Sequence, residues 1–284
     1  MLLDGSRESR NVEDRRGGGG GGVVRGGLGT LVLALVAMYF GVDPRAVIQS
    51  GPTTSRPITA QDNREKEFVS KVLASTEDVW HKLVPNYSDP QLVLFRGATE
   101  SACGRASASV GPFYCGEDSK VYIDLDFYKE LTERIGAPGD FAEAYVIAHE
   151  VGHHVQNELG TLKRVHALMA NQGSSQKNQL SVRLELQADF YAGIWAHYAR
   201  EKNLLEMGDI EEGLQAASAV GDDKLQKQGQ GYVVPDSFTH GTSEQRMRWF
   251  KKGLESGDPA QGDTFNTNNL YRRNYDAEPS HSRI

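Results

Sequence analysis

Residues 145–156 read YVIAHEVGHHVQ, an apolar run interrupted by two histidines and a glutamate. His149, Glu150 and His153 match the pattern H-E-x-x-H. Positions four apart lie one turn apart on the same face of a helix, so both imidazoles can reach one metal ion. Glu150 points beside that metal and can take a proton from a zinc-bound water. The pattern predicts a hydrolytic zinc site on a helix.

The helix that carries the motif is expected to run from Phe141 to Leu159, because Gly160 is a natural stop. Apolar residues on either side of the polar trio supply packing for this helix. His154 follows the motif directly and projects about 100° away from His153. We therefore expect His154 to be structural rather than a ligand.

A catalytic zinc site needs a third protein ligand and an open position. The next strong helical pattern runs from Ser181 to Arg200, and on it Glu185 and Asp189 share one face. Apolar neighbours make this a buried helix, which argues against an exposed acidic pair. Glu185 is expected to bind the metal, one zinc ion per chain. Asp189 is expected to accept the N–H of a ligand histidine and so fix its tautomer.

The segment from His240 to Arg246 is a third candidate element. An imidazole downstream of the metal motif could stabilise the oxyanion of a tetrahedral intermediate. Arg246 could hold this loop by pairing with a carboxylate. A further helix is expected from Asp209 to Val220, and the segment from Phe238 to Gly253 reads as a loop that leads into a last helix.

The residues before the motif predict a long helix and a small sheet. Gln61 to Leu83 has helical periodicity, whereas Leu92 to Phe95 and Val121 to Leu125 read as short strands. The second of these strands is a candidate edge for pairing with an extended substrate. The globular part is therefore expected to be mainly α, of the α+β class, in one domain over residues 61–265.

Cys103 and Cys115, the two cysteines of the chain, are separated by 12 positions. This spacing suits a disulfide that closes a short loop and stabilises the fold by about 3 kcal/mol. Two free thiols are the alternative if the domain lies in a reducing cytosol. The compartment decides between them, and the compartment depends on the N-terminal region.

Residues 26–42 form a run of 17 residues without a charge. As a helix this run would be about 26 Å long, at the short end for a bilayer span. A buried core helix and a cleaved signal peptide are the alternatives, but no A-x-A cleavage site follows. The sequence favours an uncleaved single-span anchor. A linker is then expected at residues 43–60, and a loose C-terminal tail at residues 266–284.

Arginines are slightly more numerous before the apolar run than after it. This bias predicts a cytoplasmic N-terminus and an extracytoplasmic or periplasmic domain, where a disulfide is stable. Residues 1–25 are polar and include the run GGGGGG, so they are expected to form a disordered cytoplasmic tail. The net charge is −7 and the pI about 5.7, which argues against nucleic-acid binding.

The order H-E-x-x-H, E-x-x-x-D, H-x-x-x-x-x-R resembles the gluzincin peptidases of the HtpX type, although Gly241 stands where they usually carry proline. A closer resemblance, over nearly the whole chain, is to the bacterial neutral zinc metallopeptidases of the YpfJ type. The segments that carry it are RESRNVEDRR (7–16), GPFYC (111–115), VYIDLDFY (121–128), YVIAHEVGHHVQ (145–156), RLELQAD (183–189), VVPDSFTHGTSEQR (233–246) and SGDPAQ (256–261).

This resemblance implies a zincin-like peptidase domain behind one N-terminal transmembrane helix, with a peptide or protein as substrate. Relatives often carry cysteine at the positions of Phe190 and Gly262, and the joint absence of both cysteines here implies a second disulfide in those relatives. Two rivals remain open: a membrane-tethered binding protein with a structural zinc site, and an amidase acting on cell-wall peptides. Glu150 argues against the first rival, because a structural site has no use for a base beside the metal.

Overall fold

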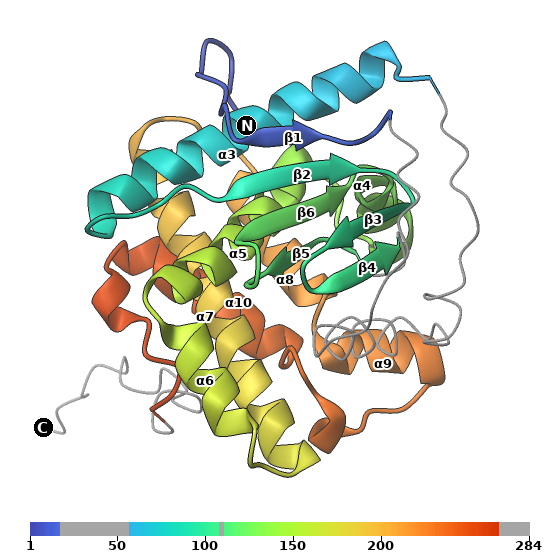
Figure 1. Cartoon of the computed structure of the whole chain (residues 1–284), viewed down its shortest axis with the longest axis vertical. Helices are drawn as coiled ribbons and strands as arrows, with labels where there is room; N and C mark the ends of the chain where they lie inside the picture. The colour runs from blue at the N-terminus through green and yellow to red at the C-terminus, as the bar shows by residue number, and fades with distance from the viewer. Residues whose placement is uncertain (18–56, 108–110, 267–284) are drawn as a thin grey trace, which may run out of the picture.

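The computed structural model describes residues 1–17, 57–107 and 111–266 (Figure 1). Within these ranges no helix is both long enough and apolar enough to span a bilayer. The apolar run predicted as an anchor, residues 26–42, lies outside them. Most of the predicted linker and nearly all of the predicted C-terminal tail also lie outside.

A four-stranded sheet has the order β1-β2-β6-β5. Strands β1 (Val12–Asp14), β2 (Gln91–Phe95) and β6 (Lys120–Asp124) are parallel, and β5 (Phe113–Cys115) runs antiparallel to β6. The expectation that residues 121–125 form an edge strand is therefore wrong. Strand β6 is hydrogen-bonded on both sides, so β5 and β1 are the outer strands of this sheet.

The register between the two central strands, β2 and β6, explains why the two faces of the sheet differ. Leu92 pairs with Val121 and Leu94 with Ile123, and these four side chains belong to the main core. Alternate residues of the same strands point to the opposite face, because side chains of a strand alternate. There they form a smaller apolar cluster that includes Cys115.

The disulfide predicted from the spacing of the cysteines is present. Cys103 and Cys115 are bonded, with their Cα atoms 5.8 Å apart. Cys103 lies in the turn of a two-stranded hairpin made by β3 (Ala98–Ser101) and β4 (Gly104–Ser107). The bond therefore ties this hairpin to β5, the outer strand next to the motif helix.

The rest of the described chain is helical, so the predicted mainly helical α+β class is confirmed. In chain order the helical segments are α3 (Ala60–Leu83), α4 (Asp126–Glu130), the π-helical turn η2 (Leu131–Ile135), α5 (Asp140–Glu158), α6 (Thr161–Met169), α7 (Ser174–Glu201), α8 (Asp209–Ala219), α9 (Asp222–Gln230), η3 (Pro235–Ser237), α10 (Ser243–Ser256) and η4 (Pro259–Gln261).

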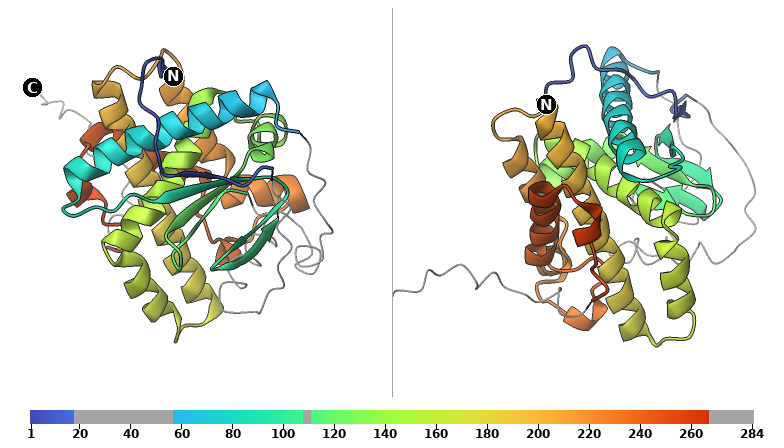
Figure 2. Two further views of the ribbon diagram at one scale, coloured as in Figure 1. Left: turned by 45° about the horizontal axis from the view of Figure 1, so that its top comes forward. Right: turned by 90° about the vertical axis from the view of Figure 1, so that its left-hand side faces the viewer.

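Helix α5 lies at the centre of the fold. It contacts β5, β6 and α3 on one side and α7 and α8 on the other, and Figure 2 shows it between the sheet and the remaining helices. Most of its residues are buried. The helix that carries the H-E-x-x-H motif is thus held from both sides, which fixes the direction of its side chains.

Two close approaches between helices set the position of α7. A Cβ atom on Gly152, inside the motif, would lie 2.9 Å from the carbonyl oxygen of Ala188 on α7. A Cβ atom on Gly193 would lie 2.0 Å from the carbonyl oxygen of Phe250 on α10. Both distances are too short for a real side chain. Glycine therefore lets α7 lie against α5 closely enough to bring Glu185 to the histidines.

Phe190 and Gly262, the two positions singled out in the sequence, are neighbours in the fold. A Cβ atom on Gly262 would lie 2.6 Å from ring carbons of Phe190. The phenyl ring, which is fully buried, occupies the space that a side chain at residue 262 would take. A side chain at residue 262 would therefore require a smaller side chain at residue 190, so substitutions at the two positions depend on each other.

The prediction of a disordered tail over residues 1–25 is wrong for residues 1–17. This segment supplies β1, which pairs with β2 from Val12↔Leu92 to Asp14↔Leu94. Met1 and Leu3 are buried in the main core. Arg16 is 4% exposed and forms an ion pair with Asp14. The polar composition of the segment suggested disorder, but several of its charged side chains form ion pairs and two of its apolar side chains, Met1 and Leu3, are packed in the core.

Candidate metal centre

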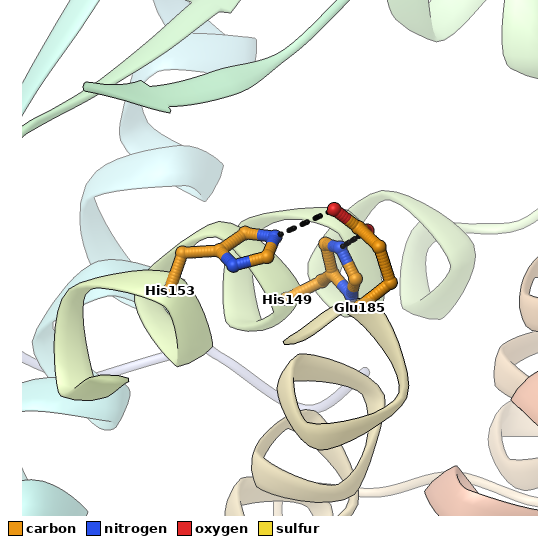
Figure 3. Close-up of side chains that lie close together, drawn as sticks. All are labelled: His149, His153 and Glu185. Atoms are coloured by element: carbon orange, nitrogen blue, oxygen red, sulfur yellow. Dashed lines mark hydrogen bonds and ion pairs between the residues drawn. The ribbon is translucent and has the colours of Figure 1, made fainter. Parts of the chain in front are cut away.

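Two helices supply the three side chains expected to hold zinc. His149 and His153 project from α5 and Glu185 from α7, and the Glu185 carboxylate faces both rings (Figure 3). Glu185 Oε2 lies 3.2 Å from His149 Nε2, and Glu185 Oε1 lies 3.5 Å from His153 Nε2. The potential ligand atoms all lie within 4.8 Å of one another.

This donor set fits zinc. Four ligands around zinc, with bonds near 2.0–2.2 Å, are separated from one another by about 3.3 Å in a tetrahedron. The two separations that involve Glu185 match this spacing. Two imidazoles and one carboxylate are also a ligand set of catalytic zinc sites, in which a fourth position stays open for water or substrate.

His149 is oriented by a buried carboxylate. Its Nδ1 lies 2.9 Å from Asp189 Oδ1, so a proton on Nδ1 is shared with Asp189 and Nε2 faces Glu185. Although burial opposes the imidazolium form, Asp189 and Glu185 raise the pKa of His149 to about 9. Burial raises the pKa of Asp189, but Arg246 and His149 outweigh it and hold that pKa at about 2.

Asp189 is in turn held by α10 and by α5. Arg246 donates to Asp189 from Nε at 2.8 Å and from Nη2 at 2.9 Å, and both residues are almost fully buried. The Tyr145 hydroxyl donates to Asp189 Oδ1 at 2.5 Å. Tyr145 escaped the sequence analysis, although it lies four residues before His149 and therefore on the same helix face.

His153 is oriented by a different residue. Its Nδ1 lies 2.9 Å from Gln156 Oε1, and Gln156 donates from Nε2 to the carbonyl of Leu184 at 2.7 Å. The same amide nitrogen lies 3.2 Å from Gln187 Oε1. Gln156 thus fixes His153 from the side opposite the metal, a role that the sequence analysis missed.

His154 points away from the three proposed ligands, as expected. Its Nε2 lies 2.7 Å from the carbonyl of Ser88, and its Nδ1 lies 3.1 Å from the Tyr114 hydroxyl. Burial lowers the pKa of His154. The neutral ring therefore donates from Nε2 and accepts at Nδ1, which attaches strand β5 to the motif helix.

Glu150 lies on α5 between the two histidines in sequence and is 8% exposed. Burial raises its pKa above the ordinary range, while the two histidines oppose that rise. Burial also raises the pKa of Glu185, but the charges of His153 and His240 outweigh it, so that pKa lies well below the ordinary range. The pKa values of the two glutamates are thus shifted in opposite directions. Glu150 is suited to exchanging a proton, whereas Glu185 stays ionised.

His240 lies on the loop between η3 and α10, and the next residue of that loop packs against α7: a Cβ atom on Gly241 would lie 3.3 Å from the side chain of Leu186, the neighbour of Glu185. Its Nδ1 lies 3.4 Å from Asp222 Oδ1. Burial lowers the pKa of His240, but the charges of Glu185 and Asp222 raise it by more than burial lowers it. The pKa of His240 therefore lies above its ordinary value. The loop is thus brought to the metal centre, although it is distant from it in sequence.

A second group of acidic side chains, Asp140, Asp209 and Glu212, also has oxygen atoms within 4.8 Å of one another. The α-amino group of Met1 lies 2.7 Å from Asp140 Oδ2 and 3.5 Å from Asp209 Oδ2. A cation of the protein itself therefore already pairs with two of these three carboxylates, and we assign the cluster no metal.

Comparison with known proteins agrees with this geometry. A family model described as "Putative neutral zinc metallopeptidase" matches residues 1–265. The uncharacterized protein YpfJ of Escherichia coli K12 is 49% identical over 283 residues, covering 93% of this chain and 99% of the relative. The uncharacterized protein Rv2575 of Mycobacterium tuberculosis is 41% identical over 258 residues, covering 82% and 86%. No solved structure matches.

Proposed function

This chain belongs to the neutral zinc metallopeptidase family, and from that premise we propose that it hydrolyses peptide bonds with a zinc-activated water. The observation that carries the proposal is the convergence of His149, His153 and Glu185 from α5 and α7. Each histidine has a separate acceptor for its other ring nitrogen, as ligand histidines of zinc enzymes usually do.

Bound by these three side chains, zinc would polarise the scissile carbonyl and lower the pKa of a water in the open position. Glu150 accepts a proton from the attacking water and delivers it to the leaving amine. Its raised pKa suits both steps, because a carboxyl that binds a proton more tightly is the stronger base and can still release the proton.

His240 supplies a hydrogen bond to the oxygen that gains negative charge as water attacks the carbonyl. The raised pKa of this histidine favours the imidazolium form, in which both ring nitrogens donate. Asp189 and Arg246 hold His149 in place and take no part in the proton transfers. The substrate that we propose is a peptide or a protein, because the family is one of peptidases.

Reconstitution of metal-free protein tests the proposal. Hydrolysis of an unstructured protein such as casein should rise with added zinc and level off at one zinc ion per chain. His153→Ala should neither bind zinc tightly nor hydrolyse casein. His81→Ala is the matched control, because His81 is half exposed and pairs with Asp89 instead. Activity that is unchanged in metal-free protein would refute the proposal.

A further inference from the structure

One buried carboxylate holds the loop that carries His240. Asp222, the first residue of α9, is 1% exposed. Its Oδ2 accepts the backbone N–H groups of Thr239 at 2.8 Å, His240 at 2.6 Å and Gly241 at 2.9 Å. The N–H of Asp222 donates back to the carbonyl of Gly241 at 2.9 Å. Four hydrogen bonds thus tie this loop to the start of α9.

The same carboxylate also reaches the imidazole. Asp222 Oδ1 lies 3.4 Å from Nδ1 of His240, and the Thr239 hydroxyl lies 2.9 Å from that nitrogen. The backbone bonds fix where the ring is attached, and the Nδ1 contacts fix how the ring is turned. An amide of the same shape cannot accept both the backbone N–H groups and a proton on Nδ1, because it has one accepting oxygen where a carboxylate has two.

The junction before α9 leaves this loop little room to move. A Cβ atom on Gly221 would lie 2.3 Å from the nitrogen of Ser243. The Asp223 carboxylate accepts the Ser243 N–H at 2.7 Å, and Arg246 donates to the carbonyl of Val220 at 3.3 Å. Because Arg246 also binds Asp189, the His240 loop and the orientation of His149 depend on one connected set of bonds.

We propose that Asp222 is a positioning residue for hydrolysis, which holds the His240 imidazole where it meets the developing oxyanion. The proposal rests on the peptidase function proposed above. Asp222→Asn should leave zinc content and KM near those of the wild type and lower kcat by up to about 10²-fold, as a misplaced catalytic group does. Glu244→Gln, which removes an exposed carboxylate three residues after Gly241, is the control and should leave kcat unchanged.

The double variant Asp222→Asn/His240→Phe separates positioning from a merely structural role. If Asp222 acts through His240, the double variant should be no slower than His240→Phe alone, because residues that act as a unit are not additive. A multiplied loss in the double variant would overturn the proposal. Wild-type protein that binds zinc but hydrolyses no peptide would instead refute the proposed function itself.

The binding of two inhibitors, which needs no turnover, tests the role of Asp222 independently. A phosphinic peptide imitates the tetrahedral intermediate, whereas acetohydroxamate binds chiefly to the metal. Asp222→Asn should weaken the phosphinic peptide by the same factor as kcat/KM and leave acetohydroxamate unaffected. Equal weakening of both ligands would show that the metal site itself has changed, and would overturn the proposal.

The packing of the N-terminal segment bears on the compartment in which that segment lies. Residues 1–17 are built into the same body as the metal centre. The Leu92 N–H donates to the carbonyl of Asn11 and the Arg15 N–H to the carbonyl of Leu94, both at 2.8 Å, on either side of the β1–β2 pairing. Lys120 on β6 reaches Glu13 at 3.1 Å.

More contacts attach the same segment to α3. The Ser9 N–H donates to the carbonyl of Ser70 at 3.1 Å, and Arg7 lies 2.9 Å from the buried carboxylate of Glu77. Figure 1 shows β1 along the outer edge of the sheet with α3 beside it. Separating residues 1–17 from this body would expose the edge of β2 and the apolar side chains of Met1 and Leu3.

We infer that residues 1–17 lie in the same compartment as the metal centre. The charge bias of the sequence put them on opposite sides of a membrane, with a single crossing between them. One sheet holds β1 from residues 1–17 beside β2 and β6, so in the folded chain this segment and the metal centre belong to one body. The disulfide adds that the shared compartment is an oxidising one.

Single introduced cysteines test this inference, because both native cysteines are bonded to each other. Glu8→Cys reports on the N-terminal segment and Glu255→Cys on α10, and both positions are exposed. In intact bacterial spheroplasts, a membrane-impermeant maleimide should label both thiols. Labelling of Glu255→Cys with protection of Glu8→Cys until lysis would overturn the shared compartment. Protection of both until lysis would overturn the oxidising compartment.

Discussion

Replacing Asp189 with asparagine should damage both the stability of the protein and its zinc affinity. The side chain of Asp189 is fully buried and accepts two hydrogen bonds from Arg246, one from Tyr145 and a contact from His149 Nδ1. The amide keeps the shape but removes the charge. The guanidinium of Arg246, 3% exposed, is then left without its counter-charge.

The expected magnitude follows from this burial. Breaking a buried ion pair by removing one partner reduces the free energy of unfolding by about 3–5 kcal/mol. In a domain of roughly 200 residues, each kcal/mol shifts Tm by about 2–4 °C, so Tm should fall by about 6–20 °C. Because His149 loses the acceptor for its Nδ1 proton, zinc affinity should fall by about 10–100-fold as well.

Urea unfolding of the metal-free protein measures the first effect, and competition with a chelator measures the second. Glu255→Gln is the control, since Glu255 and Lys251 form an exposed pair one helical turn apart that contributes about 0.3–0.5 kcal/mol. A loss of less than about 1 kcal/mol in Asp189→Asn would show that Arg246 is not dependent on this carboxylate, and the reasoning would be wrong.

Three further outcomes are expected. Gln156→Leu removes the acceptor at His153 Nδ1 and should lower zinc affinity by about 10–100-fold in the same competition assay, with casein hydrolysis recovering at excess zinc. Burial, with the charges of Glu65 and Asp140, raises the pKa of Glu143 to about 7. The folded protein therefore binds a proton at Glu143 more tightly than the unfolded chain does. The contribution of this proton to the free energy of unfolding is complete below the unfolded pKa near 4.5 and is lost as pH rises through 7. Urea unfolding of metal-free protein should therefore show a decline between pH 5 and pH 8 that Glu143→Gln reduces; an equal decline in both would contradict it. Replacing Cys103 and Cys115 together by serine should lower the free energy of unfolding by about 3 kcal/mol, and an unchanged urea midpoint would show that the bond adds nothing.

The centre of the site was predictable because its signals are local. His149 and His153 are one helical turn apart, and so are Glu185 and Asp189, so each pair defines a helix face without knowledge of the fold. Gln156 lies three residues after His153 and Tyr145 four residues before His149. Both supporting residues could have been found by the same spacing rule.

Other features depend on contacts between distant parts of the chain. Strand β1 has three residues, Val12 to Asp14, with no alternation to mark it, and it becomes a strand by pairing with β2. The central place of β6 depends on the parallel pairing of two segments joined through a hairpin and β5. Asp222 likewise has no local signal, because the loop that it holds lies 17 to 19 residues further along.

The most direct test of the account compares wild type with Glu150→Gln, both loaded with zinc. The amide keeps the shape of the side chain but cannot accept a proton from water. Both proteins should contain one zinc ion per chain, and casein hydrolysis by Glu150→Gln should be slower by at least about 10²–10⁴-fold. Unchanged hydrolysis, or loss of zinc as complete as in Glu185→Gln, would contradict the role of Glu150 as the base.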